Sequence, residues 1–202
     1  MQQVQILLYD GFDELDAIAP FEILAAAGFT VELVTLEQTP SIRTAHGMSI
    51  QPDGVLAGAP ELLVVPGGAW VSRAPAGAWA EVQRGILPAE IAARHAAGSV
   101  IAGVCTGVML LAAGGLLRGR PAVTHRAALE ELGKSGAEVH EEARVVDDGD
   151  VLTAGGVTSA LDLALHIIAR ERGEDLAAAG AQRIEYEPRG PVLDIKRLRV
   201  TG

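Results

Sequence analysis

The spacing of apolar and polar residues predicts a chain in which short strands alternate with helices. Apolar or alternating runs of a few residues are typical of strands, and apolar residues three or four positions apart are typical of helices. The predicted strands are Val4–Tyr9, Phe29–Leu36, Leu62–Val65, Val100–Val104, Ala122–Thr124, Arg144–Val146 and Val151–Thr153. The predicted helices are Pro20–Ala26, with Pro20 in its opening turn, Pro88–Ala97, Gly107–Ala113, Ala127–Leu132, Thr158–Arg170 and Leu176–Ile184.

This alternation favours an α/β fold: an open, largely parallel sheet covered by helices on both faces. No linker or shift in composition divides the 202 residues, so a single domain is predicted over residues 1–188. Residues 189–202 contain Arg189, Lys196, Arg197 and Arg199 and are predicted to form a solvated C-terminal tail.

In such a sheet, ligands collect beyond the carboxyl ends of the strands. Four informative segments follow predicted strands and are therefore expected at this edge. They are the acidic linker Asp10–Ala19, the turn Pro66–Gly68, the pair Cys105–Thr106 and the pair Thr124–His125. Together they bring a carboxylate, two glycine amides, a thiol and an imidazole to one edge of the sheet.

Cys105, the single cysteine, lies where an apolar strand changes to helical spacing. Gly103 and Gly107 bracket it and allow backbone angles that other residues resist, which predicts a strand, a sharp turn and a helix. The start of a helix favours thiolate over thiol, so the sequence predicts a lowered pKa and a nucleophile. The alternative is a small buried apolar residue.

The other segments offer partners for such a nucleophile. Gly67 and Gly68 could direct N–H groups at negative charge, together with the amide of Thr106. Asp16 could hydrogen-bond to the sulfur, as a protonated donor if it is desolvated or as a base if it is ionised, or it could cap the first helix. His125 could relay protons or orient the substrate, or be structural.

Composition narrows the function further. The formal net charge of −10 opposes nucleic-acid binding, and no apolar run reaches membrane-spanning length. One cysteine excludes an internal disulfide, and no histidine has a partner at metal-ligand spacing, so no metal and no cofactor are predicted. The N-terminal residues lack the pattern of a signal peptide, which favours the cytoplasm.

Five motifs in order resemble the PfpI-like superfamily, a class I glutamine amidotransferase-like group that includes the Parkinsonism-associated deglycase. They are Glu14–Pro20, Pro66–Gly68, Ala102–Gly107, Val123–His125 and Leu152–Leu165, within a similarity that extends from about Val4 to Tyr186. Within the group the chain is most similar to the isonitrile hydratase branch. The resemblance implies a flavodoxin-like three-layer sandwich with a cysteine nucleophile elbow and a homodimer.

By the same resemblance, Cys105 is the nucleophile, Asp16 is its acidic partner, and Gly67, Gly68 and Thr106 line the oxyanion side. Two positions depart from related patterns. Thr106 stands where protease-like members have histidine, and Arg126 follows His125 where the branch commonly has an aromatic residue.

The resemblance therefore implies a cofactor-independent lyase that hydrates a small-molecule isonitrile to an N-substituted formamide. Two alternatives use the same thiol. One is an oxidative-stress sensor in which Cys105 becomes a sulfinate. The other is a glyoxalase or deglycase that attacks the carbonyl carbon of an aldehyde.

Overall fold

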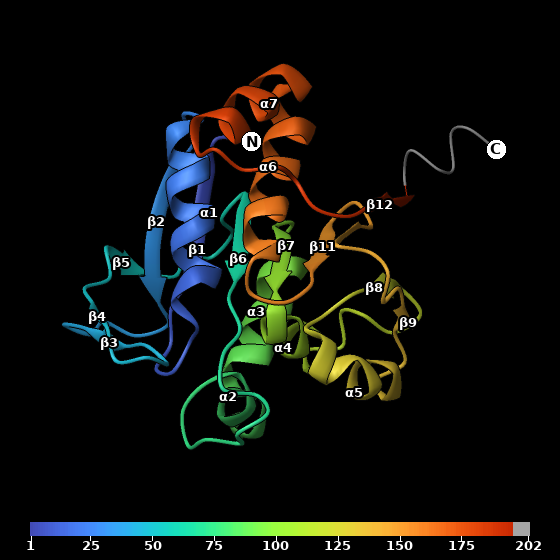
Figure 1. The fold of residues 1–202 in the computed structure, drawn as a ribbon. Coiled ribbons are helices and arrows are strands. Elements are labelled where there is room, and N and C mark those ends of the chain that lie inside the picture. The colour runs from blue at the N-terminus through green and yellow to red at the C-terminus, as the bar shows by residue number, and fades with distance from the viewer. Residues whose placement is uncertain (196–202) are drawn as a thin grey trace.

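An eight-stranded sheet forms the centre of the molecule in the computed structural model, which describes residues 1–195 (Figure 1). The strand order is β12-β10-β11-β7-β6-β1-β2-β5, and neighbours run parallel except in the β10–β11 hairpin. The strands are β1 (Gln3–Leu7), β2 (Thr30–Thr35), β5 (Gly54–Val55), β6 (Leu62–Val65), β7 (Val100–Val104), β10 (Val145–Asp147), β11 (Val151–Ala154) and β12 (Val192–Asp194).

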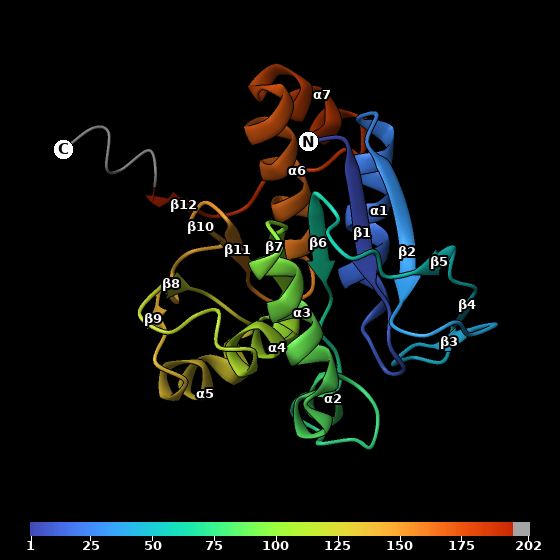
Figure 2. The ribbon, with the colours of Figure 1, turned by 180° about the vertical axis from the view of Figure 1, so that it is seen from behind.

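Helices cover both faces of this sheet. On one face α1 (Glu14–Ala26) packs against α6 (Ser159–Arg172), which packs against α7 (Glu174–Arg183). On the other face lie α2 (Ala78–Arg84), α3 (Ile86–Ala96) and α4 (Val108–Ala113), seen nearer the viewer in Figure 2. The predicted flavodoxin-like three-layer α/β sandwich is thus confirmed.

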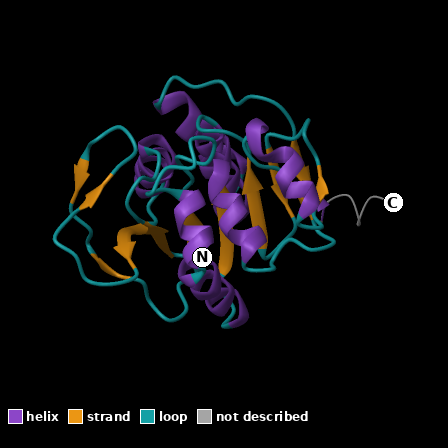
Figure 3. Cartoon of the chain, turned by 90° about the horizontal axis from the view of Figure 1, so that it is seen from below, coloured by secondary structure: helices purple, strands orange, loops and turns teal. Residues whose placement is uncertain are grey.

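Smaller elements gather at the end of the molecule where the parallel strands have their carboxyl ends (Figure 3). They include an antiparallel pair around Gly47, formed by β3 (Ile42–Arg43) and β4 (Ser49–Ile50). The others are the pair of β8 (Pro121–Ala122) and β9 (Glu138–Val139), the helix α5 (Leu129–Lys134), and two 3₁₀ turns at Cys105–Gly107 and Arg126–Ala128.

The first helix begins six residues earlier than the sequence predicts. It starts at Glu14, and the side chain of Asp13 caps it by accepting a hydrogen bond from the N–H of Leu15. Pro20 lies inside the helix rather than in its opening turn; it is buried beside Ile23 and Leu24, and this packing compensates for the backbone hydrogen bond that proline cannot make. The predicted linker therefore ends at Asp13, and Asp16 lies in the first helical turn.

Several segments hold elements that the sequence pattern missed, β5 and β9 among them. Trp79 lies on α2, a helix that the pattern did not predict, and its ring packs edge-on against Trp70 with the centroids 5.4 Å apart. Val192–Asp194, from the predicted tail, forms β12 and pairs with β10. The basic residues Lys196, Arg197 and Arg199 lie outside the described residues. Within residues 1–195, no helix is long and apolar enough to span a membrane.

Candidate active site

Cys105 occupies a strained turn between β7 and the short helix α4. Its φ is 54°, in the left-handed region that residues other than glycine seldom adopt. Its N–H donates to the carbonyl of Gly155 at 3.0 Å, and its carbonyl accepts from the Thr124 hydroxyl at 2.7 Å. The predicted elbow is therefore present, and contacts from two other segments hold it in place.

The glycines near Cys105 serve a different purpose from the predicted one. Gly107 has an ordinary φ of −60°, so it supplies no unusual backbone angle. Instead it allows close approach, because a Cβ at Gly107 would lie 2.2 Å from the carbonyl oxygen of Val65. The unusual backbone angle that was expected at the glycines is found at Cys105 itself.

Asp16 lies next to the thiol and is fully buried. Its Oδ2 accepts the N–H of Gly67 at 2.9 Å, whereas the buried Oδ1 has no hydrogen-bond partner among the described residues. Burial raises the pKa of Asp16 well above its usual range; contacts with Gly67 and the Cys105 thiol oppose this rise only partly. Burial therefore favours the protonated carboxyl, and a protonated Oδ1 would offer a donor that no other described residue uses.

The pKa of the Cys105 thiol is raised, whereas the sequence predicts a lowered pKa. Burial raises the pKa of Cys105 to about 12, and the negative charge of an ionised Asp16 raises it further. The N–H groups of Val157 and Thr106 lower it, but they do not compensate for burial. The prediction of a lowered pKa is contradicted because the side chain is only 5% exposed and because α4 has only six residues.

We expect this raised pKa to appear in the pH dependence of alkylation. The rate constant for iodoacetamide at Cys105 should keep rising above pH 9, because the pKa of about 12 leaves little thiolate at lower pH. The urea-denatured protein is the control, since its single thiol should show an ordinary midpoint of about 8.5. A midpoint at or below that of the denatured chain would show that the fold favours the thiolate.

The two glycine amides predicted as oxyanion donors are already engaged. The N–H of Gly67 donates to Asp16, and the N–H of Gly68 donates to the Thr106 hydroxyl at 2.9 Å. The amide of Thr106 approaches the sulfur, as predicted, and that of Val157 does so as well. Gly67 and Gly68 therefore position Asp16 and Thr106, and the two amides at the sulfur are those of Thr106 and Val157.

His125, unlike the other predicted site residues, does not follow a strand of the main sheet. It follows β8, which belongs to the small β8–β9 sheet and not to the main sheet. Its Nδ1 accepts the N–H of Ala127 at 3.1 Å, which leaves Nε2 as the ring nitrogen that can donate. The ring packs so closely on Gly156 that a Cβ there would lie 2.5 Å from its Cδ2. The imidazole thus caps a turn and lines a pocket.

Val157 and Tyr9 are site residues that the sequence reasoning missed. Val157 follows the pair Gly155–Gly156 after β11 and has a φ of 30°. The glycine pair, within a motif that the resemblance already included, was the available signal. Tyr9 donates to the carbonyl of Pro66 at 2.5 Å; burial, and then the charges of Asp16 and Cys105, raise its pKa well above 10.

One group of potential metal ligands lies near the start of α1. Asp13, Glu14 and His46 place ligand atoms within 4.8 Å of one another. His46 Nδ1 is 2.6 Å from a carboxylate oxygen of Glu14. Although burial acts against it, hydrogen bonds from Thr44 and His46 lower the pKa of Glu14 to about 2. This group was not visible in the sequence because His46 is distant from Asp13 and Glu14 along the chain, and the absence of a metal stays a prediction.

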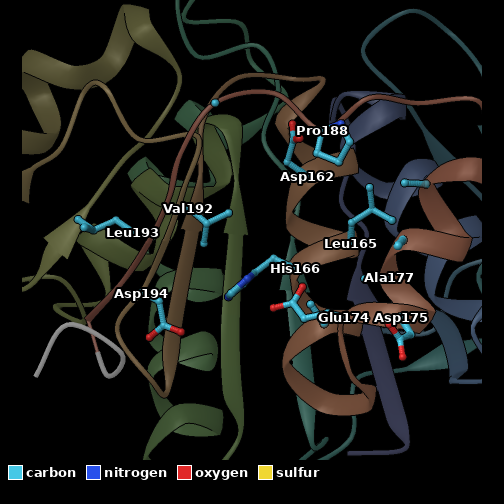
Figure 4. Close-up of a pocket in the computed structure, with 14 residues that line it drawn as sticks. Asp162, Leu165, His166, Glu174, Asp175, Ala177, Pro188, Val192, Leu193 and Asp194 are labelled. Carbon is cyan, nitrogen blue, oxygen red and sulfur yellow. The ribbon is translucent and has the colours of Figure 1, made fainter. Parts of the chain in front are cut away.

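Two pockets bear on ligand binding. One, of about 730 Å³, adjoins the elbow and is lined by His125, Arg126 and the glycine pair after β11, among others. The other, of about 590 Å³, lies between α6, α7 and the segment that ends in β12 (Figure 4). Its lining includes Asp162, His166 and Asp194 but none of the predicted site residues, so the pocket beside the elbow is the one relevant to Cys105.

Comparison with known proteins places these features in context. The model of the DJ-1/PfpI family matches residues 2–170. An isonitrile hydratase from Pseudomonas putida is 32% identical over 192 residues, which cover 94% of this chain and 80% of that protein. A Parkinson disease protein 7 homolog from Danio rerio is 25% identical over 182 residues, covering 86% of this chain and 91% of that one.

A solved structure of a family member is also similar to this chain. The crystal structure of a ThiJ/PfpI family protein from Pseudomonas syringae superposes with a TM-score of 0.80 at 27% identity, covering 95% of this chain and 78% of that one.

Proposed function

Because the chain belongs to the DJ-1/PfpI family, we propose that it is a cysteine-dependent lyase that hydrates an isonitrile to an N-substituted formamide. The observation that carries this proposal is the buried pair formed by the Cys105 thiol and the Asp16 carboxyl. The isonitrile hydratase of Pseudomonas putida, 32% identical, supports the choice of substrate class.

The raised pKa values of both groups fit addition to an isonitrile. Burial favours the protonated form of both groups, so the pair can hold two protons, one on sulfur and one on the carboxyl. The terminal carbon of R–N≡C accepts a proton and a nucleophile at the same atom. Asp16 gives its proton to this carbon, the sulfur of Cys105 bonds to it, and the thiol proton returns to Asp16. The product is a thioimidate, Cys–S–CH=N–R, formed without net separation of charge.

Water then completes the reaction. It adds to the thioimidate carbon, and the nitrogen takes up a proton to give a tetrahedral intermediate. The C–S bond breaks as the hydroxyl oxygen loses its proton to the departing sulfur and forms a C=O bond. The formamide R–NH–CHO is released and the thiol is regenerated. The N–H groups of Val157 and Thr106 stabilise negative charge on sulfur in both steps.

The experiment is a substrate panel with the purified protein. Saturable conversion of an isonitrile to its formamide, followed by chromatography and lost in Cys105→Ser, supports the proposal. Conversion of methylglyoxal with no conversion of isonitriles would overturn it in favour of an aldehyde-directed enzyme. Mass gain at Cys105 on peroxide treatment, without turnover of any substrate, would overturn it in favour of a sensor.

We expect His125→Ala to keep measurable turnover, between about 1% and 30% of the wild-type kcat. The imidazole caps a turn through Ala127 and lines the pocket, whereas Asp16 already supplies the proton. Steady-state kinetics on the best isonitrile of the panel measures this. A folded His125→Ala protein as inactive as Cys105→Ala would instead identify a cysteine–histidine pair as the catalytic unit.

A further inference from the structure

The pocket beside the elbow is larger than the addition of sulfur and water to one isonitrile carbon requires. It measures about 730 Å³ and is continuous with the groups that hold Cys105. Gly155 accepts the N–H of Cys105, Thr124 donates to its carbonyl, and the amide of Val157 approaches its sulfur. All three residues also line the pocket. Its lining does not include Cys105 or Asp16 themselves, so it can hold only the part of a substrate that extends away from the thiol.

Arg126 places an unpaired positive charge in this pocket. Two arginines line it, but Arg144 already contacts Asp162 and Thr158, each at 2.7 Å. Arg126 is exposed and has no hydrogen bond, ion pair or aromatic contact within residues 1–195. A guanidinium without a protein partner, in a pocket next to a nucleophile, is available to a ligand.

A second donor in the same pocket is also unused. The side chain of Ser159 is fully buried, and its hydroxyl has no hydrogen-bond partner among residues 1–195. Ser159 is the first residue of α6, a helix of 14 residues, so its hydroxyl lies at the positive end of the helix dipole. The N–H groups of Ser159 and Ala160 already make turn hydrogen bonds, which leaves the hydroxyl and the dipole to favour an anion.

We propose that this pocket binds a carboxylate at the end of the substrate remote from the isonitrile carbon, with Arg126 as the residue that determines this specificity. The inference rests on the proposed function, because it assigns a substrate class to the same site. Glu141 and Glu142 also line the pocket; their negative charges oppose any anion, and they oppose a doubly charged group such as a phosphate monoester more strongly than a single carboxylate, whose charge Arg126 can balance. The substrate class is therefore an isonitrile with one carboxylate on its substituent.

A test that needs no turnover uses two alkylating probes of matched size. N-(iodoacetyl)glycine carries a carboxylate, and N-(iodoacetyl)glycinamide is its neutral counterpart. We expect the ratio of their rate constants at Cys105 to fall about tenfold in Arg126→Gln, which corresponds to roughly 1.4 kcal/mol. Ser159→Ala should lower the ratio by about threefold, and Arg126→Lys should keep it within about threefold of the wild-type value.

Arg118→Gln is the matched control. Arg118 is exposed, has no partner among the described residues and lines none of the pockets described here, so its loss should leave the ratio unchanged. An unchanged ratio in Arg126→Gln, or an equal fall in Arg118→Gln, would overturn the proposal.

A measurement of turnover distinguishes a failure of this inference from a failure of the proposed function on which it rests. The pair is 3-isocyanopropanoate and its primary amide, and we expect kcat/KM to favour the carboxylate by about tenfold through Arg126. If the alkylation ratio responds to Arg126→Gln but no isonitrile is converted, the proposed function fails and the anion pocket stands. If isonitriles are converted but neither ratio responds, the function stands and the pocket assignment fails.

Discussion

Cys105→Ser is expected to lower isonitrile hydration by about 10³-fold or more while the protein stays folded. Serine is close to cysteine in size and suits the tight, buried position, so the strained turn is retained. A hydroxyl is much less acidic and less nucleophilic than a thiol, and no residue near Cys105 compensates for that difference. The measurements are the rate of formamide release and the thermal unfolding midpoint.

Two further variants sharpen this result. Cys105→Ala removes the nucleophile altogether and should match the serine variant in activity. Thr106→Val keeps the backbone amide that approaches the sulfur but removes the hydroxyl that accepts from Gly68, so it should keep more activity than either. A folded Cys105→Ser protein with a tenth of the wild-type rate would mean that hydration does not pass through the thiol.

Asp16→Asn should lower turnover by about 10²- to 10⁴-fold without lowering the unfolding midpoint at neutral pH. The amide keeps the shape of the carboxyl but cannot give its proton to the isonitrile carbon. It also removes a buried acid whose pKa burial raises. Such an acid stabilises the fold while protonated, and this stability is lost as pH rises through its raised pKa. We therefore expect Asp16→Asn to resist alkaline unfolding better than wild type.

Asp13→Asn is the matched control for this variant. Asp13 caps α1, and asparagine caps helices about as well as aspartate does. Its charge also raises the pKa of both Asp16 and Cys105, so the change removes a nearby carboxylate without touching the pair itself. Its turnover should stay within a few-fold of wild type. If Asp16→Asn instead unfolds early but reacts normally while folded, Asp16 is a structural residue.

The sheet was predictable because its signal is local. The runs Leu62–Val65 and Val100–Val104 are apolar throughout, as strands buried on both faces require, and both were placed to the residue. Cys105 was predictable for the same reason, since a change from strand to helical spacing is visible within one segment. The start of α1 was missed because proline usually opens a helix, and the buried packing around Pro20 is not visible in sequence.

The proton state of the site was less accessible from sequence. A helix start next to a cysteine predicts a lowered pKa, but the fold surrounds the thiol with Asp16 and the loop after β11, and burial dominates. The hydrogen-bond partners of the glycine amides could not be predicted from the sequence either. The partners of Gly67 and Gly68 are side chains 51 and 38 residues away, so only the folded chain shows that these donors are already occupied.

The groups that contact Cys105 also bear on how the protein acquires its final structure. Asp16 follows β1, Gly67 follows β6, and Val157 follows β11, so the surroundings of the thiol draw on strands from most of the length of the chain. Contacts between residues so distant in sequence require long loops to close, which slows folding. The single thiol is then protected from labelling only when both halves of the sheet have joined. We therefore expect the loss of Cys105 accessibility to labelling during refolding to report when the whole domain has folded.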